Sequence, residues 1–474
     1  MKDAIAFMGL GYKGPSYYAL RCTLLQDMKN DVRLVVDSYR SVWTDTGCTI
    51  MGDGWKNSRS RSLINFLVYC PKGVSFIKSV DASDFVTNAQ TLCNLFEEII
   101  EFVGPHNVVH LVTDNGSNYK AAGRLISDKF YHISWSPCAA HCLNLISKDL
   151  QICLMWRVLA VHASSISVFV YNHKWTLGWL RKQPKWTKII RPGPTRFATT
   201  FIALKSIYDR YHELQTMVTS KEFNLWSGSK SKRGKKIKDI VLAKMLWNDC
   251  LIIIKIVSPL LRLLRIVDSN EKPALGYVYE GMYRARKGIK ETFQNKKRLY
   301  KPYTKIVKER WDKLLRRDIH AAAHWLNPAF QYNQLTFSHK SEVMNGLLEV
   351  IETKVTCKKA KLLDEIRLFR EREKGFGRNL ALSTCQSMRL DEWWRMFGHD
   401  APNLKNLAIR LLSQTASSSG CERNWSAFER IHTNVRNRLE HERLNDLVYV
   451  HYNLRLKNRF VLYYTKLVIF LVNS

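Results

Sequence analysis

The stretch "TIMGDGW" (residues 49–55) places a single acid, Asp53, at the end of a short apolar run, between two glycines and before a tryptophan. Two runs rich in β-branched and aromatic residues follow, SLINFLVYC (62–70) and VSFIKSVD (74–81), as is typical of strands. Only Pro71-Lys72-Gly73 separates these two runs. Such short connections predict three antiparallel strands that follow one another as a meander.

The hydrophobic period changes after the third predicted strand. Apolar residues recur at helical spacing over 87–104, and the nearly continuous apolar run 107–114 is typical of a central parallel strand ending in Asp114. A helix over 115–130, a short strand over 132–138 and a helix over 139–150 are expected next. The order β-β-β-α-β-α-β-α predicts an α/β fold with a mixed sheet, the RNase H-like fold.

The rest of the chain is expected to be helical. Strand signals fade over 151–385, which predicts a large, basic, all-α insertion domain and linker, and GSKSKRGKKIK (228–238) is expected to be a flexible basic loop. The predicted organisation is an N-terminal helical or linker segment (1–48), the first part of the core (49–150), the insertion (151–385), a helical C-terminal region (386–456) and an atypical apolar tail (457–474).

The charge of the chain points to a polyanionic partner. Its 474 residues carry 74 Lys and Arg against 41 Asp and Glu, a net charge of +33. A field of that sign favours nucleic acid, with solubility or an anionic membrane surface as the alternatives. The 11 cysteines follow no regular spacing, which indicates reduced intracellular thiols. No signal peptide is expected, and the apolar stretch 460–472 is too short to span a bilayer.

Asp53 and Asp114 are expected to lie together. They end the first and fourth predicted strands, which are neighbours in this fold. Two adjacent carboxylates repel each other unless a cation lies between them, and Mg²⁺ prefers such oxygen ligands. The pair therefore predicts a site for two-metal phosphoryl transfer. Each aspartate on its own is equally typical of a turn.

A third acid is suggested by a resemblance. Residues 417–426 (SSSGCERNWS) resemble the S-x-x-S-E-R-x-F-S motif in the C-terminal dimerisation region of hAT-superfamily DNA transposases. Trp425 replaces the usual phenylalanine, and Cys421 stands where serine is common. LVYVHYNLR (447–455) also looks like that region.

The resemblance covers most of the chain. The segments around Asp53 and Asp114 and the stretch 136–150 are similar to a plant transposase-derived domain, and HAAAHWLNP (320–328) resembles its linking region. The family implies a D-D-E site of Asp53, Asp114 and Glu422 that binds Mg²⁺ or Mn²⁺, with the C-terminal segment completing the catalytic core. It also implies DNA as a partner, a nuclear location, and a homodimer or higher oligomer through 386–456.

Cys138 and His141 form the C-x-x-H element that the family places after the fifth strand. Two ligands do not make a tetrahedral zinc site, so no structural zinc is expected. The preferred interpretation is that His141 packs or forms hydrogen bonds near the acids or DNA. Cys138 is expected to be a buried residue.

Two further segments are candidates for DNA contact. Pro194-Thr195-Arg196-Phe197 resembles the P-T-R-W segment of the family's insertion domain, in which the aromatic residue handles a base; a helix-start arginine and a core phenylalanine are the alternative. Residues 284–317 hold 14 Lys and Arg against 3 Asp and Glu, which predicts phosphate contacts, although a solvated helix face has the same pattern. The residues expected to bind DNA are Arg196, Phe197, Lys296, Lys297, Arg298, Lys301 and Lys305.

Three functions remain open at this point. The N-terminal BED-type zinc finger of active relatives is not expected, because no C-x-x-C followed by paired histidines occurs. We therefore expect a truncated, degraded or domesticated form. It is either a metal-dependent DNA-cutting enzyme, a catalytically silent dimerising DNA-binding protein, or a nuclease of the same fold unrelated to transposition. No membrane partner is expected.

Overall fold

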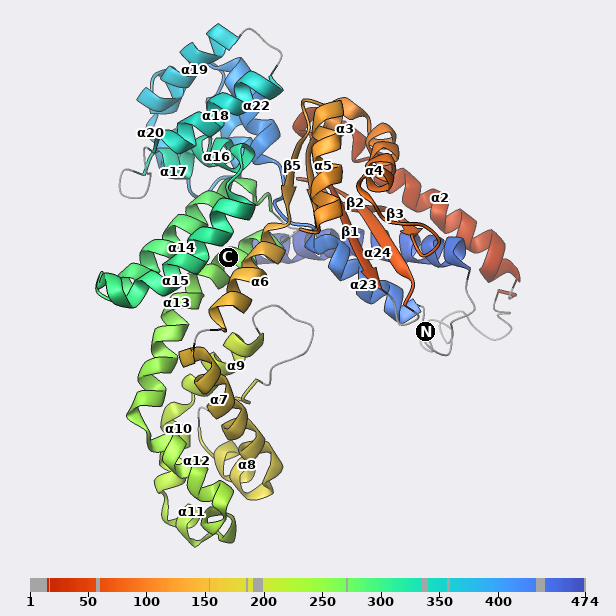
Figure 1. Ribbon diagram of the computed structural model, residues 1–474. Coiled ribbons are helices and arrows are strands. Elements are labelled where there is room, and N and C mark those ends of the chain that lie inside the picture. The colour runs from red at the N-terminus through yellow and green to blue at the C-terminus, as the bar shows by residue number, and fades with distance from the viewer. Residues whose placement is uncertain are drawn as a thin grey trace. The chain divides into compact units, whose positions relative to one another are not determined.

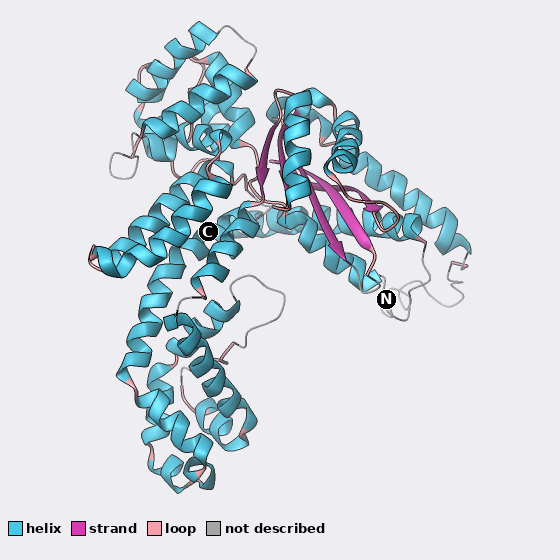
Figure 2. Ribbon diagram, in the orientation of Figure 1, coloured by secondary structure: helices cyan, strands magenta, loops and turns pink. Residues whose placement is uncertain are grey.

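The computed structural model describes residues 15–472, apart from 17, 57–59, 153, 185, 191–198, 270–271, 334–339, 356–358 and 432–439. The chain divides into two units, each described here by itself (Figures 1 and 2). The first unit comprises Met1–Cys138, Asn270–Leu275 and Glu349–Ser474, and the second comprises Ala139–Ser269 and Gly276–Leu348.

The first unit is built on a mixed sheet in the order β3-β2-β1-β4-β5. Strands β1, β2 and β3 pair antiparallel, whereas β4 pairs parallel with β1 and β5 parallel with β4. The predicted meander and the central position of the fourth strand beside the first are thus confirmed. The strands are β1 (Cys48–Lys56), β2 (Ser62–Cys70), β3 (Gly73–Asp81), β4 (Val108–Thr113) and β5 (Ser134–Pro137).

Helices cover both faces of this sheet (Figure 1). Ile50 packs on one side with Phe96 of α4, and Met51 on the other with Phe428 of α23, because neighbouring strand residues face opposite ways. Trp43, fully buried, shows that the N-terminal helical segment belongs to this core. The helices are η1 (Ala19–Thr23), α2 (Leu24–Asp37), α3 (Arg40–Thr46), α4 (Ala89–Val103), η2 (Pro105–Asn107), α5 (Ser117–Lys129), α19 (Lys359–Glu371), η6 (Lys374–Gly377), α20 (Asn379–Thr384), α21 (Leu390–Phe397), α22 (Pro402–Leu412), α23 (Ser419–Ile431) and α24 (His441–Val472).

Every secondary structure element among the described residues of the second unit is a helix (Figure 2). Its elements are α6 (Ala139–Leu150), α7 (Leu154–Asn172), α8 (Lys174–Arg181), α9 (Thr199–Tyr208), α10 (Tyr211–Thr219), α11 (Lys221–Leu225), η3 (Ser227–Lys230), α12 (Lys232–Leu242), α13 (Lys244–Asp268), α14 (Val278–Thr292), α15 (Lys297–Arg310), η5 (Trp311–Leu315), α16 (Asp318–Trp325) and α17 (Pro328–Gln331). η4 (Leu275–Tyr277) and α18 (Ser341–Lys354) cross its boundaries.

The expectation of a flexible loop over 228–238 is wrong. Most of the segment lies in α12, whose first turn is capped by the Ser231 hydroxyl. Ile237, Ile240 and Val241 bury one face of the helix at helical spacing. Ile240 and Val241 lie beyond the basic run, which itself contains only Ile237 of this apolar face. The charged residues of the run therefore concealed its helical period.

No single helix among the described residues is long and apolar enough to cross a membrane. One bent pair, Ala139–Leu150 with Met155–Asn172, has the length and composition but breaks by 91°. The apolar side of its first helix is buried in the protein, as in an ordinary core helix.

Candidate active site

The sheet brings Asp53 and Asp114 to adjacent positions. In the parallel pairing of β1 with β4, Gly52 lies opposite Thr113, so the next residue of each strand is an aspartate. One detail of the prediction is wrong, because β1 does not end at Asp53. It continues to Lys56, held by antiparallel pairing with β2, and Asp53 instead follows the last residue that pairs with β4.

Glu422 reaches this region on the first turn of α23. The helix packs on the sheet face that Met51 and Trp55 share. Trp425 stacks on Trp55 with the ring centroids 5.9 Å apart and the planes 20° apart, and Phe428 meets Trp55 edge-on at 5.8 Å. Trp425, the substitution noted in the motif, therefore fixes the helix beside the strand of Asp53.

The buried carboxyl of Asp53 lies within electrostatic reach of Asp114 and Glu422. Asp53 is only 6% exposed. Burial, together with the negative charges of Asp114 and Glu422, raises the pKa of its carboxyl well above the usual range, whereas hydrogen bonds from Ser418 and the Gly54 backbone oppose the shift. Among the described residues, no three acidic, histidine or cysteine side chains lie close enough to hold a metal ion as they stand.

The segment that leads into α23 is held against the sheet by buried polar side chains. Thr49 of β1 donates to the Gln414 amide oxygen at 2.8 Å. His110 of β4 lies 3.0 Å from the Thr415 carbonyl through Nδ1 and 2.8 Å from Ser136 Oγ through Nε2. A carbonyl oxygen only accepts, so Nδ1 carries the proton and donates it. These bonds set the register of the segment before it reaches Glu422.

Cys138 also holds this segment against the sheet, through contacts with Ser417 and Ser418. It is 1% exposed, which confirms the prediction of a buried residue. Its sulfur accepts from the Ser418 backbone N–H at 3.3 Å and lies 3.4 Å from Ser417 Oγ. His141 lies, half-buried, on α6 in the second unit.

Two residues near the acids were not foreseen, Ser418 and Tyr119. Ser418 Oγ lies 3.4 Å from Oδ2 of Asp53. Burial and the carboxylates of Asp53 and Asp114 raise the pKa of the Tyr119 phenol. A Cβ at Gly54 would lie 2.8 Å from the Tyr119 hydroxyl oxygen, so only glycine permits this approach. In the sequence, the signal for this close approach was Gly54, which directly follows Asp53.

The predicted DNA-binding residues lie in the second unit or outside the described residues. Lys296 directly precedes α15, and all five basic candidates of this region are exposed, as expected of side chains available to phosphates. Lys305 lies 3.8 Å from Glu309. Arg196 and Phe197 lie outside the described residues. The five exposed candidates are Lys296, Lys297, Arg298, Lys301 and Lys305.

Two family models match the chain. Residues 15–166 match a domain of unknown function, DUF659, and residues 361–454 match the hAT family C-terminal dimerisation region. The first match contains Asp53 and Asp114, and the second contains Glu422. No curated protein matches the chain. With both matches present in this order, the chain is similar to hAT transposases.

Proposed function

We propose that this protein binds DNA in the nucleus and breaks or joins DNA strands by phosphoryl transfer at Asp53, Asp114 and Glu422. The observation that carries the proposal is the adjacency of Asp53 and Asp114 at the pairing of β1 with β4, beside the segment that leads into the helix of Glu422. Placing like charges together in a buried position destabilises the folded protein. Such arrangements are typical of functional sites.

The proposed fold of the first unit is RNase H-like. The strand order β3-β2-β1-β4-β5, with β4 and β5 running parallel to β1, supports it. The helices of the second unit would then be an insertion between the sheet and the C-terminal region, and α23 would complete the catalytic core by supplying Glu422.

The donor set suits Mg²⁺ or Mn²⁺, which prefer carboxylate oxygens. When bound, such ions activate the attacking oxygen and stabilise the leaving oxygen. Asp53, Asp114 and Glu422 would hold them. The three carboxylates would have to draw closer together than they are in the described arrangement, and neutralisation by the cations would offset their mutual repulsion.

The remaining side chains of the site position these acids. Ser418 and the Gly54 backbone hydrogen-bond to the Asp53 carboxylate and favour its ionised form, which a metal requires. The Trp55–Trp425 stack fixes α23 against β1, and the Tyr119 hydroxyl lies against β1 at Gly54.

Dimerisation and DNA binding complete the proposal. The match over residues 361–454 supports association of two copies through that region. The exposed lysines and arginine at 296–305 would contact DNA phosphates with little sequence preference.

A catalytically silent, dimerising DNA-binding protein is the alternative. It is favoured by the burial of Asp53, because burial raises the pKa of its carboxyl and so opposes the ionised form that binds a metal. In this alternative, DNA binding and dimerisation would be the same as in the main proposal.

A cleavage assay with Mg²⁺ or Mn²⁺ separates the two functions. Asp53→Asn, Asp114→Asn and Glu422→Gln should each reduce DNA nicking by at least about a hundredfold, because each removes a metal ligand. Glu429→Gln, an exposed residue of the same helix, is the matched control and should cut like the parent. A parent protein that binds DNA and dimerises without cutting would select the silent alternative. Cutting that survives Asp53→Asn would reject this active site.

A further inference from the structure

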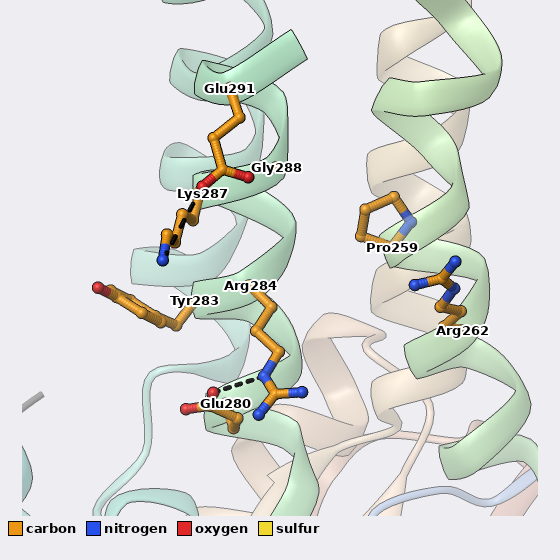
Figure 3. A pocket seen from close by; sticks show the side chains of 8 residues that line it. All are labelled: Pro259, Arg262, Glu280, Tyr283, Arg284, Lys287, Gly288 and Glu291. Carbon is orange, nitrogen blue, oxygen red and sulfur yellow. Dashed lines mark hydrogen bonds and ion pairs between the residues drawn. The ribbon is translucent and has the colours of Figure 1, made fainter. Parts of the chain in front are cut away.

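The second unit holds a surface pocket that the proposed function does not use. Helices α13 and α14 border an open space of about 320 Å³ (Figure 3). α13 contributes Pro259 and Arg262, and every other lining residue comes from α14. The pocket is thus formed entirely within one helical pair.

Three cationic residues are part of the lining, Arg262, Arg284 and Lys287, together with the two carboxylates of Glu280 and Glu291. The Lys287 ammonium group extends to the side of α14 away from α13 (Figure 3). Lys287 lies 3.9 Å from Glu291, too far for a short hydrogen bond. Arg262 makes no ion pair with any residue that the structure describes. The pocket therefore has an excess of positive charge and one cation without an acidic partner in the described part of the chain.

An ion pair with the buried carboxylate of Glu280 orients the side chain of Arg284. Its Nε donates to Oε1 of Glu280 at 2.6 Å, and Glu280 is only 3% exposed. This bond occupies one side of the guanidinium group and leaves its two terminal amino groups for another acceptor. Figure 3 shows the guanidinium groups of Arg262 and Arg284 extending from the two helices into the space between them.

The pocket wall is made of residues that weaken a helix. Pro259 lies inside α13, where it removes a backbone hydrogen bond. Gly288 lies inside α14, at a cost of about 1 kcal/mol relative to alanine. A Cβ at Gly288 would lie 3.5 Å from Cγ of Pro259, in ordinary contact, so a longer side chain would extend into the pocket. The missing side chain keeps the space open.

We propose that this pocket is a phosphate-binding site, in which Arg262 and Arg284 hold a phosphate group beside the wall of Pro259 and Gly288. Two guanidinium groups that face one space repel each other, and an anion between them removes that cost. A guanidinium fork matches phosphate oxygens in pairs, which favours phosphate over a simple halide. The group comes either from the DNA backbone or from a free phosphate. The site uses none of the three acids, so it stands independently of the proposed catalysis.

Calorimetric titration of the full chain with inorganic phosphate tests the site without DNA or divalent metal. Arg262→Gln should weaken phosphate binding about tenfold or more, since a hydrogen bond to a charged group contributes about 1.5–3 kcal/mol. Arg265→Gln is the matched control, because Arg265 is exposed on the same helix and does not line the pocket. It should bind phosphate within about twofold of the parent.

A pair of substitutions at Gly288 tests the space without changing any charge. Gly288→Leu should fill the pocket and abolish phosphate binding, whereas Gly288→Ala should bind nearly normally. Thermal melting checks the fold of each variant, and Arg262→Gln decides the question if Gly288→Leu does not fold. A parent that binds no phosphate, or equal binding by the parent and Arg262→Gln, would overturn the proposal.

Titration with a short DNA duplex identifies the source of the phosphate. If DNA supplies it, Arg262→Gln should weaken duplex binding and lower the slope of log K against log salt by about one, and Arg265→Gln should not. Weakened binding of inorganic phosphate with unchanged duplex binding would assign the pocket to a free phosphate.

Discussion

The hydroxyl oxygen of Ser418 lies 3.4 Å from Oδ2 of Asp53, although 365 positions separate the two residues in the chain. Ser418 also donates its backbone N–H to Cys138, which follows the last strand of the sheet. One buried serine thus joins the N-terminal sheet to the segment that carries Glu422.

Ser418→Ala should shift the pH dependence of DNA cleavage to higher pH. The hydroxyl lowers the pKa of Asp53, so its removal leaves the shift from burial and from the other acids less opposed. A higher pH is then needed to ionise Asp53 for metal binding. The pH–rate profile measures this. Ser426→Ala, exposed on α23, is the control, and equal profiles for both variants would contradict the prediction.

Asp53→Asn should stabilise the metal-free protein at pH 7. The pKa of Asp53 is raised on folding, so the folded state binds more protons than the unfolded state between the ordinary pKa and the raised one. Stability of the parent therefore falls as pH rises through that window. The gain in melting temperature should shrink as pH approaches 4, near the ordinary pKa of an aspartate. A gain that is the same at both pH values would contradict this cause.

Mg²⁺ should raise the melting temperature of the parent and leave that of Asp53→Asn nearly unchanged. A ligand that binds only the folded state stabilises it by an amount that grows with the logarithm of the ligand concentration above its Kd. Ca²⁺, with its looser geometry, serves as a second cation, and Glu429→Gln should respond like the parent. Equal shifts in the parent and Asp53→Asn would place the metal elsewhere.

Gly52→Ala and Gly54→Ala should both be harmful for different reasons. A Cβ at Gly52 would lie 2.5 Å from the Phe96 ring, which predicts a loss of about 1–3 kcal/mol in the free energy of unfolding. A Cβ at Gly54 would displace the Tyr119 hydroxyl, so cleavage should fall more than stability. Phe96→Leu should partly restore the stability of Gly52→Ala and do nothing for Gly54→Ala. Urea unfolding and nicking rates distinguish the two effects.

The second unit should lose stability as pH falls from about 6.5 to 4. Burial lowers the pKa of His320 to about 4 and that of His324 to about 4. The unfolded state binds more protons than the folded state in this window, so stability is present above pH 6.5 and is lost on acidification. His324→Phe keeps the stacking on Tyr279 and Phe330 and should reduce the acid sensitivity. The control is His212→Gln, an exposed residue of α10, which should leave it unchanged.

Much of the sheet could be predicted because its signals are local. The β-branched runs at 62–70 and 74–81 and the short turn between them fix strands and their direction without reference to the rest of the chain. The adjacency of Asp53 and Asp114 then followed from strand order alone. Where a basic run masked the apolar period, as in α12, the same method failed.

The surroundings of the acids could not be predicted, because they depend on contacts between distant segments. Tyr119 and Ser418 carry no motif of their own, and only the folded chain brings them to Asp53. The end of β1 was missed for a similar reason, since pairing with β2 extends the strand past the glycine at position 54.

The bonds from Thr49 and His110 to the segment at 414–415 also have a meaning for protein synthesis. A ribosome would release the sheet with its two aspartates several hundred residues before the final acid emerges. A chain that ended before this segment would lack both partners and also α23 and α24, which cover one face of the sheet. Folding of the first unit is therefore completed only when the C-terminal region has been synthesised.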